Sequence, residues 1–408
     1  MVIVLALCLP LRAAETITTV SIDTWGVMSQ GKMACLDYHY ATTTIFWAEI
    51  ALVTLSGKTR TVAIPTDNTL PYYISYGFDN NHLVYIPYLS TGSGGGGGGG
   101  GTSGSGGRTC YIYDKNISTG VIRQISISDK WKETVWLKGN LAVWADYRYW
   151  DSTTVDSVNS EIYMYDLAAN QERRITSDHA WQGEPFTDGS RLVWIDYAQA
   201  YGRLFMYDVA ASTTVEIAAY SAAKDDPRID GNSVVWVDYR NATLNPHNSD
   251  IYLYNRSTST TTVVCNATGY QGNPFVSGNW IVWEDFRNAT GTDSLNADIY
   301  GYRIDTGISV PLVVAAGYQG HPTINNDTLC WFDMAGTSMT LKMANISTTT
   351  GVINPHTIQI RSIEPTDKSY MITPTGRAVH GRKMAAGVYL ENGKTGSSSK
   401  IIQMRKTP

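Results

Sequence analysis

The residues best suited to contact a ligand lie in a short turn that occurs three times along the chain. It reads aromatic-Gln-Gly-x-Pro, and its copies are Trp181 to Pro185, Tyr270 to Pro274 and Tyr318 to Pro322. Tyr and Trp offer a large contact area with a polar tip, and a glutamine amide both donates and accepts hydrogen bonds. Such groups suit ligand recognition better than covalent chemistry. The candidate ligand-binding residues are therefore Trp181, Gln182, Tyr270, Gln271, Tyr318 and Gln319.

A plainer interpretation of this turn is that it only leads the chain into the next strand. A fourth unit has Lys224-Asp-Asp-Pro227 at the equivalent place, without the aromatic residue or the glutamine. Both interpretations stay open at this point.

No motif indicates a catalytic centre, a metal site or a cofactor, so we expect none of them. A Gly-x-Ser-x-Gly nucleophile turn is absent, and an adjacent acid pair such as Asp225-Asp226 is common on surfaces. The seven histidines show no metal-binding spacing, and the cysteines after Cys8 include no Cys-x-x-Cys. The glycine run from Gly94 to Gly101 lacks the Lys-Ser/Thr of a phosphate-binding loop and indicates a flexible loop. A polysaccharide lyase stays open, because its catalytic groups need not be contiguous.

The elements that would position these residues belong to a repeat. Its best-preserved copy is Gly278 to Arg287, and the repeated Trp falls at residues 144, 194, 236, 283 and 331. A second apolar run follows each time, such as Ile251 to Asn255. Alternating apolar and polar residues predict strands, and repeats of this length indicate a propeller or a solenoid of sheets.

Two weaker copies precede these five, which gives seven units that start near residues 24, 65, 128, 177, 219, 266 and 315. Each unit divides into four short strands. The predicted fold is therefore all-β: a β-propeller of about seven four-stranded blades over 15–354, with six or eight as alternatives, plus a small C-terminal β-module. Thr16 to Ile22 fits the last-strand position, and we expect it to complete the final blade and close the ring.

The strands of a blade alternate in direction, so two kinds of loop open on one face. They are the turns between blades and the insertions between the second and third strands, at 89–108, 149–160, 241–249 and 288–297. This face is where we expect a ligand.

Charged residues vary together across the hairpin of strands two and three. Four units have a base at the end of the second strand and an acid at the start of the third, and the other three lack both. The pairs are His39 with Glu49, Arg148 with Glu161, Arg240 with Asp250 and Arg287 with Asp298. This pattern predicts a cross-strand ion pair worth about 0.2–1 kcal/mol. A ring of catalytic Asp and Arg is the alternative.

The repeated Val-Trp-x-Asp-x-Arg and Asp-Ile-Tyr-x-Tyr-Asp strands resemble those of the TolB-like propeller family. The resemblance covers about residues 24–354 and is closest over 128–333. It implies extracytoplasmic binding or scaffolding more often than chemistry.

The two ends of the chain differ from the repeat. Residues 1–14 resemble the end of a secretory signal peptide, which predicts an exported protein. The tail, 355–408, carries Gly376-Arg377, Gly387-Val-Tyr389 and Lys400-Ile-Ile402 and is similar to the C-terminal sorting domain of type IX secretion. A basic β-module packed on the acidic propeller is the alternative. Seven Asn-x-Ser/Thr sequons would lie on surface turns of a glycoprotein.

The sequence thus predicts a secreted or cell-surface, non-catalytic propeller that binds a protein or glycan partner through its loop-rich face. The alternatives are a carbohydrate-active enzyme such as a polysaccharide lyase and a structural coat subunit. A net charge of -5 argues against nucleic acid as a partner, and we expect no transmembrane segment.

Overall fold

The computed structural model describes most of the repeat region and five short strands of the tail. The described residues are 27–29, 32–40, 46–54, 60–64, 71–89, 110–150, 159–178, 180–198, 201–218, 222–242, 248–290, 296–335, 338–347, 356–357, 370–372, 378–380, 389–392 and 400–403. These residues contain strands and turns but no helix, and hence no helix that could cross a bilayer. The predicted all-β class is confirmed.

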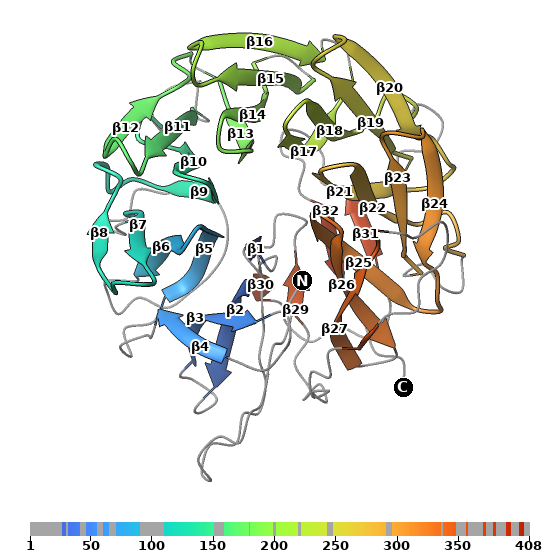
Figure 1. The fold of residues 1–408 in the computed structure, drawn as a ribbon, viewed down its shortest axis with the longest axis horizontal. Helices are drawn as coiled ribbons and strands as arrows, with labels where there is room; N and C mark the ends of the chain where they lie inside the picture. Colours follow the sequence, from blue (N-terminus) through green and yellow to red (C-terminus); the bar gives the residue numbers. More distant parts are fainter. Residues whose placement is uncertain are drawn as a thin grey trace.

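Eight four-stranded antiparallel sheets make up this part of the chain, and the first seven stand around a common axis as blades (Figure 1). Blade one contains β1 (Val27–Ser29), β2 (Lys32–Tyr40), β3 (Phe46–Thr54) and β4 (Arg60–Ile64). Blade two contains β5 (Pro71–Asp79), β6 (His82–Leu89), β7 (Tyr113–Asn116) and β8 (Ile122–Gln124). Blade three contains β9 (Lys132–Lys138), β10 (Leu141–Asp146), β11 (Glu161–Asp166) and β12 (Gln171–Arg174). Blade four contains β13 (Gln182–Thr187), β14 (Arg191–Asp196), β15 (Arg203–Asp208) and β16 (Thr213–Ala218).

The remaining blades repeat this plan. Blade five contains β17 (Lys224–Asp230), β18 (Ser233–Asp238), β19 (Asp250–Asn255) and β20 (Thr260–Cys265). Blade six contains β21 (Gln271–Ser277), β22 (Trp280–Asp285), β23 (Asp298–Arg303) and β24 (Ile308–Val313). Blade seven contains β25 (Tyr318–Asn325), β26 (Thr328–Ala335), β27 (Ser338–Asn345) and β28 (His356–Thr357). The tail sheet contains β29 (Tyr370–Ile372), β30 (Ala378–His380), β31 (Tyr389–Asn392) and β32 (Lys400–Gln403).

The first strand of each blade lines the axis, and these inner strands contact one another in the cyclic order β1, β5, β9, β13, β17, β21, β25 and back to β1. Where the ring closes, the Asn325 side-chain amide donates a 3.1 Å hydrogen bond to the carbonyl of Met28. The outer strand of blade seven is β28, which pairs with β27. The outer position predicted for Thr16 to Ile22 is therefore taken by β28, which follows β27 in the chain. That segment, the predicted signal peptide and the glycine run lie outside the described residues.

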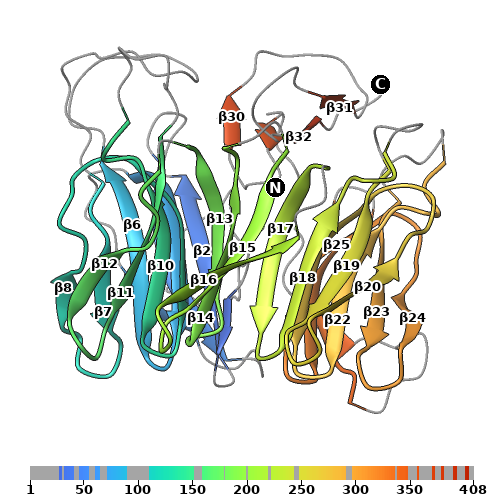
Figure 2. The same ribbon diagram turned by 90° about the horizontal axis from the view of Figure 1, so that it is seen from above.

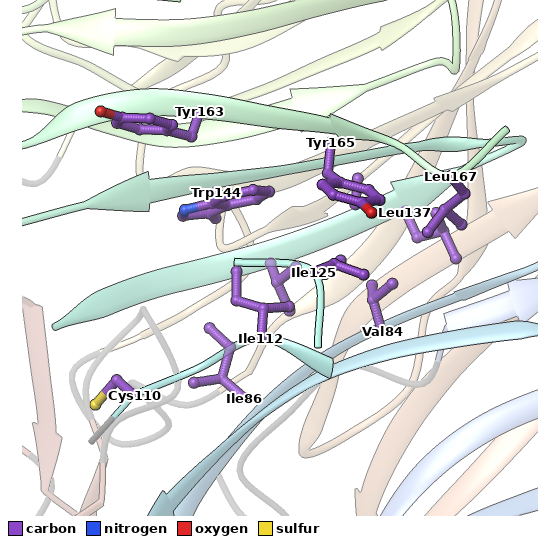
Figure 3. Packing of buried hydrophobic residues seen from close by; sticks show 12 residues of the cluster. Val84, Ile86, Cys110, Ile112, Ile125, Leu137, Trp144, Tyr163, Tyr165 and Leu167 are labelled. Atoms are coloured by element: carbon purple, nitrogen blue, oxygen red, sulfur yellow. The ribbon is translucent and has the colours of Figure 1, made fainter. Parts of the chain in front are cut away.

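The repeated Trp fills the space between neighbouring blades. Trp144 is fully buried and stacks on Tyr163 of the next strand, with 6.0 Å between ring centroids. Figure 3 shows it facing Ile86, Ile112 and other apolar side chains of blade two. Trp194, Trp236 and Trp283 stack in the same way on Phe205, Tyr252 and Tyr300. Because each Trp covers the preceding blade, the repeat cannot fold as a single unit.

The predicted ion pair across strands two and three is wrong for the three arginines, while the side chains of His39 and Glu49 lie outside what the structure describes. Each arginine turns back to the aspartate two residues before it in the chain, at distances of 2.6–2.7 Å: Arg148 to Asp146, Arg240 to Asp238 and Arg287 to Asp285. The same aspartates accept from the indole N–H of the repeated Trp. Each guanidinium also lies 3.9–4.0 Å from the centroid of the tyrosine ring on the third strand. The arginine therefore varies together with the third strand because its guanidinium stacks on a tyrosine of that strand. Its ion pair, in contrast, lies within the second strand.

The third-strand acids have other partners. Asp250 and Asp298 accept from Asn241 and Asn288, and Glu161 pairs with Arg174. In the two blades whose arginine is replaced by Ala198 or Ala335, the Trp194 and Trp331 indole nitrogens have no hydrogen-bond partner among the described residues. The arginine thus holds the aspartate in the orientation that the tryptophan needs.

Candidate functional site

The aromatic-Gln-Gly-x-Pro motif forms the start of an inner strand together with a β-bulge. The pairing register with the second strand shifts between Gly183 and Phe186, and equivalent shifts occur in blades six and seven. The residue at position x has a left-handed backbone, with φ of 55° at Glu184 and 50° at Asn273 and at His321. In blade five, Asp226 has φ of 51° at the same place. The bulge changes the direction of this side chain and leaves the backbone N–H of the same residue available for a contact with the preceding blade.

The glycine of the motif makes room for the aromatic residue two positions before it. A Cβ on Gly272 would lie 2.4 Å from the Tyr270 hydroxyl oxygen, and one on Gly320 would lie 2.3 Å from a carboxylate oxygen of Glu284. Blade five has Ala223 in place of the aromatic residue and Asp225 in place of the glycine. The two changes go together because the glycine is needed only beneath a ring that folds back over it.

The glutamine of the motif is buried between blades. Gln182, Gln271 and Gln319 are all 0% exposed, and blades three and five have the equally buried Lys132 and Lys224 at this position. The Lys132 ammonium donates to the carbonyls of Ser128 and Lys130, at 2.6 and 2.9 Å. Lys224 donates to the carbonyls of Gly202 and Ala222, at 3.1 and 2.9 Å. Burial lowers the pKa of both lysines.

The three predicted glutamines therefore occupy a position that joins one blade to the next. Gln182 donates to Asp178, and the Gln319 amide faces the carbonyls of Ala315 and Ala297. The aromatic partners Trp181 and Tyr270 are half-buried beside the axis, while Tyr318 is 4% exposed. Whether any of the six contacts a ligand stays a prediction.

A set of acidic and aromatic side chains from blades three to seven lies at the starts of the inner strands, and we call it the carboxylate–tyrosine belt. Its members are Glu133, Tyr147, Glu184, Tyr197, Asp225, Tyr239, Tyr270, Glu284, Tyr318 and His321. In blades three to five, an inner-strand acid accepts from the tyrosine that follows the Trp-x-Asp sequence. The pairs are Glu133 with Tyr147 at 2.9 Å, Glu184 with Tyr197 at 3.2 Å and Asp225 with Tyr239 at 3.0 Å.

Contacts between blades link these pairs. The Trp181 indole stacks on Tyr197 and donates to the Tyr147 hydroxyl at 3.1 Å. The Glu184 carboxylate accepts from the backbone N–H of Asp226 in the next blade, at 2.7 Å. The belt is therefore one network, built from residues of different blades.

Blades six and seven form the belt differently. Phe286 replaces the tyrosine, and the acid is Glu284 on the second strand, where other blades have Ala145, Ile195 or Val237. Glu284 is 2% exposed and accepts from the Tyr318 hydroxyl at 2.5 Å, from the His321 N–H at 2.6 Å and from the Asn273 side-chain amide. A carboxylate at an apolar position is thus hydrogen-bonded both by the next blade and by Asn273 of its own blade.

Burial shifts the pKa values of several belt residues. Burial, together with the neighbouring charges of Asp225 and Asp226, raises the pKa of Glu184 well above its usual range. Burial lowers the pKa of His321, although Glu284 opposes this shift. Burial also raises the pKa of Tyr239, Tyr270 and Tyr318. A carboxyl group with a raised pKa and a histidine with a lowered pKa are therefore placed in the same belt.

Farther along the inner strands from the belt, Arg228 packs among aromatic side chains. Its side chain is 6% exposed and lies 5.1–5.9 Å from the ring centroids of Trp136, Phe186 and Phe275. The same rings, with Phe78, line a cavity of about 80 Å³ at the far end of the inner strands. Figure 2 shows β17 running from one face of the propeller to the other. The belt, at the starts of the inner strands, and the cavity, at their ends, therefore lie toward opposite faces.

The belt lies beside the turns where the sequence predicted a ligand site, but of its members only Tyr270 and Tyr318 were among the predicted residues. A usable signal was present: Asp-Tyr follows the Trp at 146–147, 196–197 and 238–239, and Glu284 is an acid in an apolar position. Among the described residues, no group of three or more His, Cys, Asp or Glu side chains is placed to hold a metal ion.

Comparison with known proteins identifies the fold. No protein-family profile matches the chain, and no curated protein sequence matches it. A prolyl endopeptidase structure matches with a TM-score of 0.61 and 9% identity, covering 89% of this chain and 54% of that one. The β-propeller domain of the Trilobed protease from Pyrococcus furiosus matches with a TM-score of 0.59 and 7% identity, covering 85% and 97%. An oligogalacturonate lyase from Vibrio parahaemolyticus matches with a TM-score of 0.53 and 13% identity, covering 82% and 93%.

These matches confirm the β-propeller fold, and they correct the prediction of a non-catalytic protein. Peptidases and a lyase are among the chains that share the fold, so these matches give no support to the prediction of a non-catalytic protein. The chain spans about half the length of the prolyl endopeptidase and of other matched peptidases. The identities are low, so the comparison shows the fold and leaves the reaction to be argued from the site.

Proposed function

We propose that this propeller is a carbohydrate-active enzyme that cleaves glycosidic bonds at the carboxylate–tyrosine belt. The observation that carries the proposal is the pairing of Glu184, whose pKa is raised, with the neighbouring acids Asp225 and Asp226. A carboxyl group with a raised pKa is the usual general acid of glycosidic bond cleavage. The match to an oligogalacturonate lyase over 93% of that chain supports the idea that a propeller of this size acts without a further domain.

In this proposal, Glu184 is the general acid that gives a proton to the departing sugar oxygen. Burial and the neighbouring charges of Asp225 and Asp226 raise the pKa of this carboxyl group, which favours its protonated form. His321, neutral because of burial, is the base that removes a proton from water or from the sugar carbon. Trp181 and Tyr270 supply half-buried ring faces for sugar rings. The glycan partner predicted from the sequence is thus proposed as a substrate.

The test is a panel of neutral and uronic-acid polysaccharides incubated with the full chain. New reducing ends without unsaturated products would indicate hydrolysis, and ultraviolet-absorbing unsaturated sugars would indicate elimination. Glu184→Gln should lower kcat about 10²–10⁴-fold, because the general acid is lost. Arg303→Gln, at an exposed ion pair far from the belt, is the matched control and should leave kcat unchanged. An active Glu184→Gln variant, or no product from any polysaccharide, would remove the proposal.

A second candidate follows from the length comparison. A propeller that spans half of several peptidases would act in peptide cleavage with a catalytic domain on another chain or segment. The acidic belt would then favour basic peptides. Peptide hydrolysis that appears only when such a domain is added, without activity on polysaccharides, would favour this candidate.

Secretion, the TolB-like assignment and the sorting role of the tail are proposed on the sequence alone. An export signal and an extracellular polysaccharide substrate are consistent with each other. Mapping both ends of the protein recovered from its host tests all three, because a cleaved leader and a cleaved tail each change the mass.

A further inference from the structure

We propose that a hard metal cation, such as Ca²⁺ or Na⁺, binds between blades five and six at Asp250 and Gln271. The site lies away from the acid–base groups of the belt and is independent of the proposed function. It joins the start of the third strand of blade five to the start of the inner strand of blade six.

Asp250 is a buried carboxylate with few partners. It is 0% exposed, and its Oδ2 accepts a single hydrogen bond, from the Asn241 amide at 2.5 Å. Its Oδ1 has no hydrogen-bond partner among the described residues, and none of their ion pairs includes Asp250. The nearby Arg240 guanidinium is engaged by Asp238 at 2.6 Å. Removing a carboxylate from water in this way is costly unless a cation or a proton neutralises it.

Gln271 provides the second observation. It is also 0% exposed, and neither its Oε1 nor its Nε2 has a hydrogen-bond partner within the described part of the chain. At the equivalent boundary between blades three and four, the Thr176 hydroxyl contacts both the Glu161 carboxylate and Gln182 Oε1, at 2.6 and 3.1 Å. Cys265 stands at that place in blade five, paired with Ile251. The hydroxyl bridge between acid and glutamine is therefore missing here.

Other blades show that this position accepts positive charge. The Lys132 ammonium contacts the carbonyl four residues before it, Ser128, and the Lys224 ammonium contacts the carbonyl of Gly202, which precedes a third strand. At the boundary between blades five and six, the corresponding carbonyls belong to Ala267 and Ser249. Where the inner strand begins with lysine, the preceding blade has no acid at the start of its third strand, as at Arg203.

A cation at Asp250 would thus play the part that the lysine ammonium plays in blades three and five. The expected ligands are Asp250 Oδ1, Gln271 Oε1 and the two backbone carbonyls. This all-oxygen set suits Ca²⁺ or Na⁺ better than Zn²⁺ or copper. Burial raises the pKa of Asp250, so a bound proton is the competing way to neutralise the site.

The experiment measures bound metal and thermal stability of the full chain. After dialysis against Ca²⁺, elemental analysis should find about one equivalent, and Tm should rise by about 2–6 °C over the chelated protein. Parallel samples in Na⁺ and K⁺ distinguish the cations. Asp250→Asn should lose both the metal and the shift in Tm.

Two further variants make the test specific. Asp298→Asn, at the next boundary, should keep the metal, because Asp298 Oδ1 already accepts from the Ala315 N–H at 3.3 Å. Gln271→Lys should supply a built-in ammonium, so its Tm should no longer depend on added cations. The proposal is overturned if the wild type binds no metal and its Tm is the same in Ca²⁺, Na⁺, K⁺ and chelator. It is also overturned if Asp298→Asn loses the metal as Asp250→Asn does.

Discussion

The Tyr318 hydroxyl donates a 2.5 Å hydrogen bond to the Glu284 carboxylate, and this contact joins blade seven to blade six inside the belt. Both groups are buried, at 4% and 2% exposure, so neither can exchange the contact for water at little cost. Glu284 also orders the left-handed backbone at His321 by accepting its N–H. The acid therefore holds both the ring and the imidazole of the next blade.

A double-mutant cycle should measure this contact. We expect a coupling free energy of about 1–3 kcal/mol between Tyr318→Phe and Glu284→Gln, because each change leaves a buried partner unsatisfied. Chemical denaturation of the four proteins gives the value. The exposed pair Arg303 and Asp305 is the control and should show no measurable coupling. Additive effects at Tyr318 and Glu284 would mean that the hydrogen bond contributes nothing to stability.

The stability of the protein should depend on pH through Glu184. Its folded-state pKa lies above the usual 4.5, so the native state holds this proton more tightly than the unfolded chain does. The resulting stabilisation is fully present below pH 4.5 and is lost as the pH rises through the folded-state pKa. Glu184→Gln removes that dependence. The variant should gain stability relative to the wild type at pH 8 but not at pH 4, as urea titrations at the two pH values would show.

The buried lysine of blade five should be replaceable by glutamine but not by an apolar side chain. Lys224→Gln restores the residue found at this position in three other blades and should cost less than about 1 kcal/mol. Lys224→Met leaves the carbonyls of Gly202 and Ala222 without a donor and should cost about 1–3 kcal/mol. Equal destabilisation by both variants would show that the position is governed by side-chain volume.

The repeated arginine should not tolerate lysine. Arg287 contacts both carboxylate oxygens of Asp285 and stacks on Tyr300, and an ammonium cannot do both. Arg287→Lys should therefore cost about 1 kcal/mol in the free energy of unfolding. Arg303→Lys, on the exposed edge of the same blade, should be silent in the same denaturation experiment.

Much of the architecture could be predicted from the sequence. The spacing of the repeated Trp, with alternating strands between its copies, was sufficient for a propeller, because a tryptophan of this kind is buried only against a neighbouring blade. The bulged turn before each inner strand could also be located, since aromatic, glycine and proline positions reflect local sterics.

Side-chain partners were decided by the tertiary structure. The covariation of Arg287 with Asp298 suggested an ion pair. Arg287 instead pairs with Asp285 on its own strand and stacks on the ring of Tyr300. Glutamines that looked like ligand contacts are buried because their position lies between blades.

The belt itself could not be deduced from any one repeat. Glu133 and His321 are far apart in the chain, and each of the five contributing blades supplies only two belt residues. The sequence determined the strands, the turns and the Trp core, because these depend on local periodicity and on contacts between successive units. The shifted pKa values of Glu184 and His321 arise only when neighbouring blades pack together and exclude water from these groups.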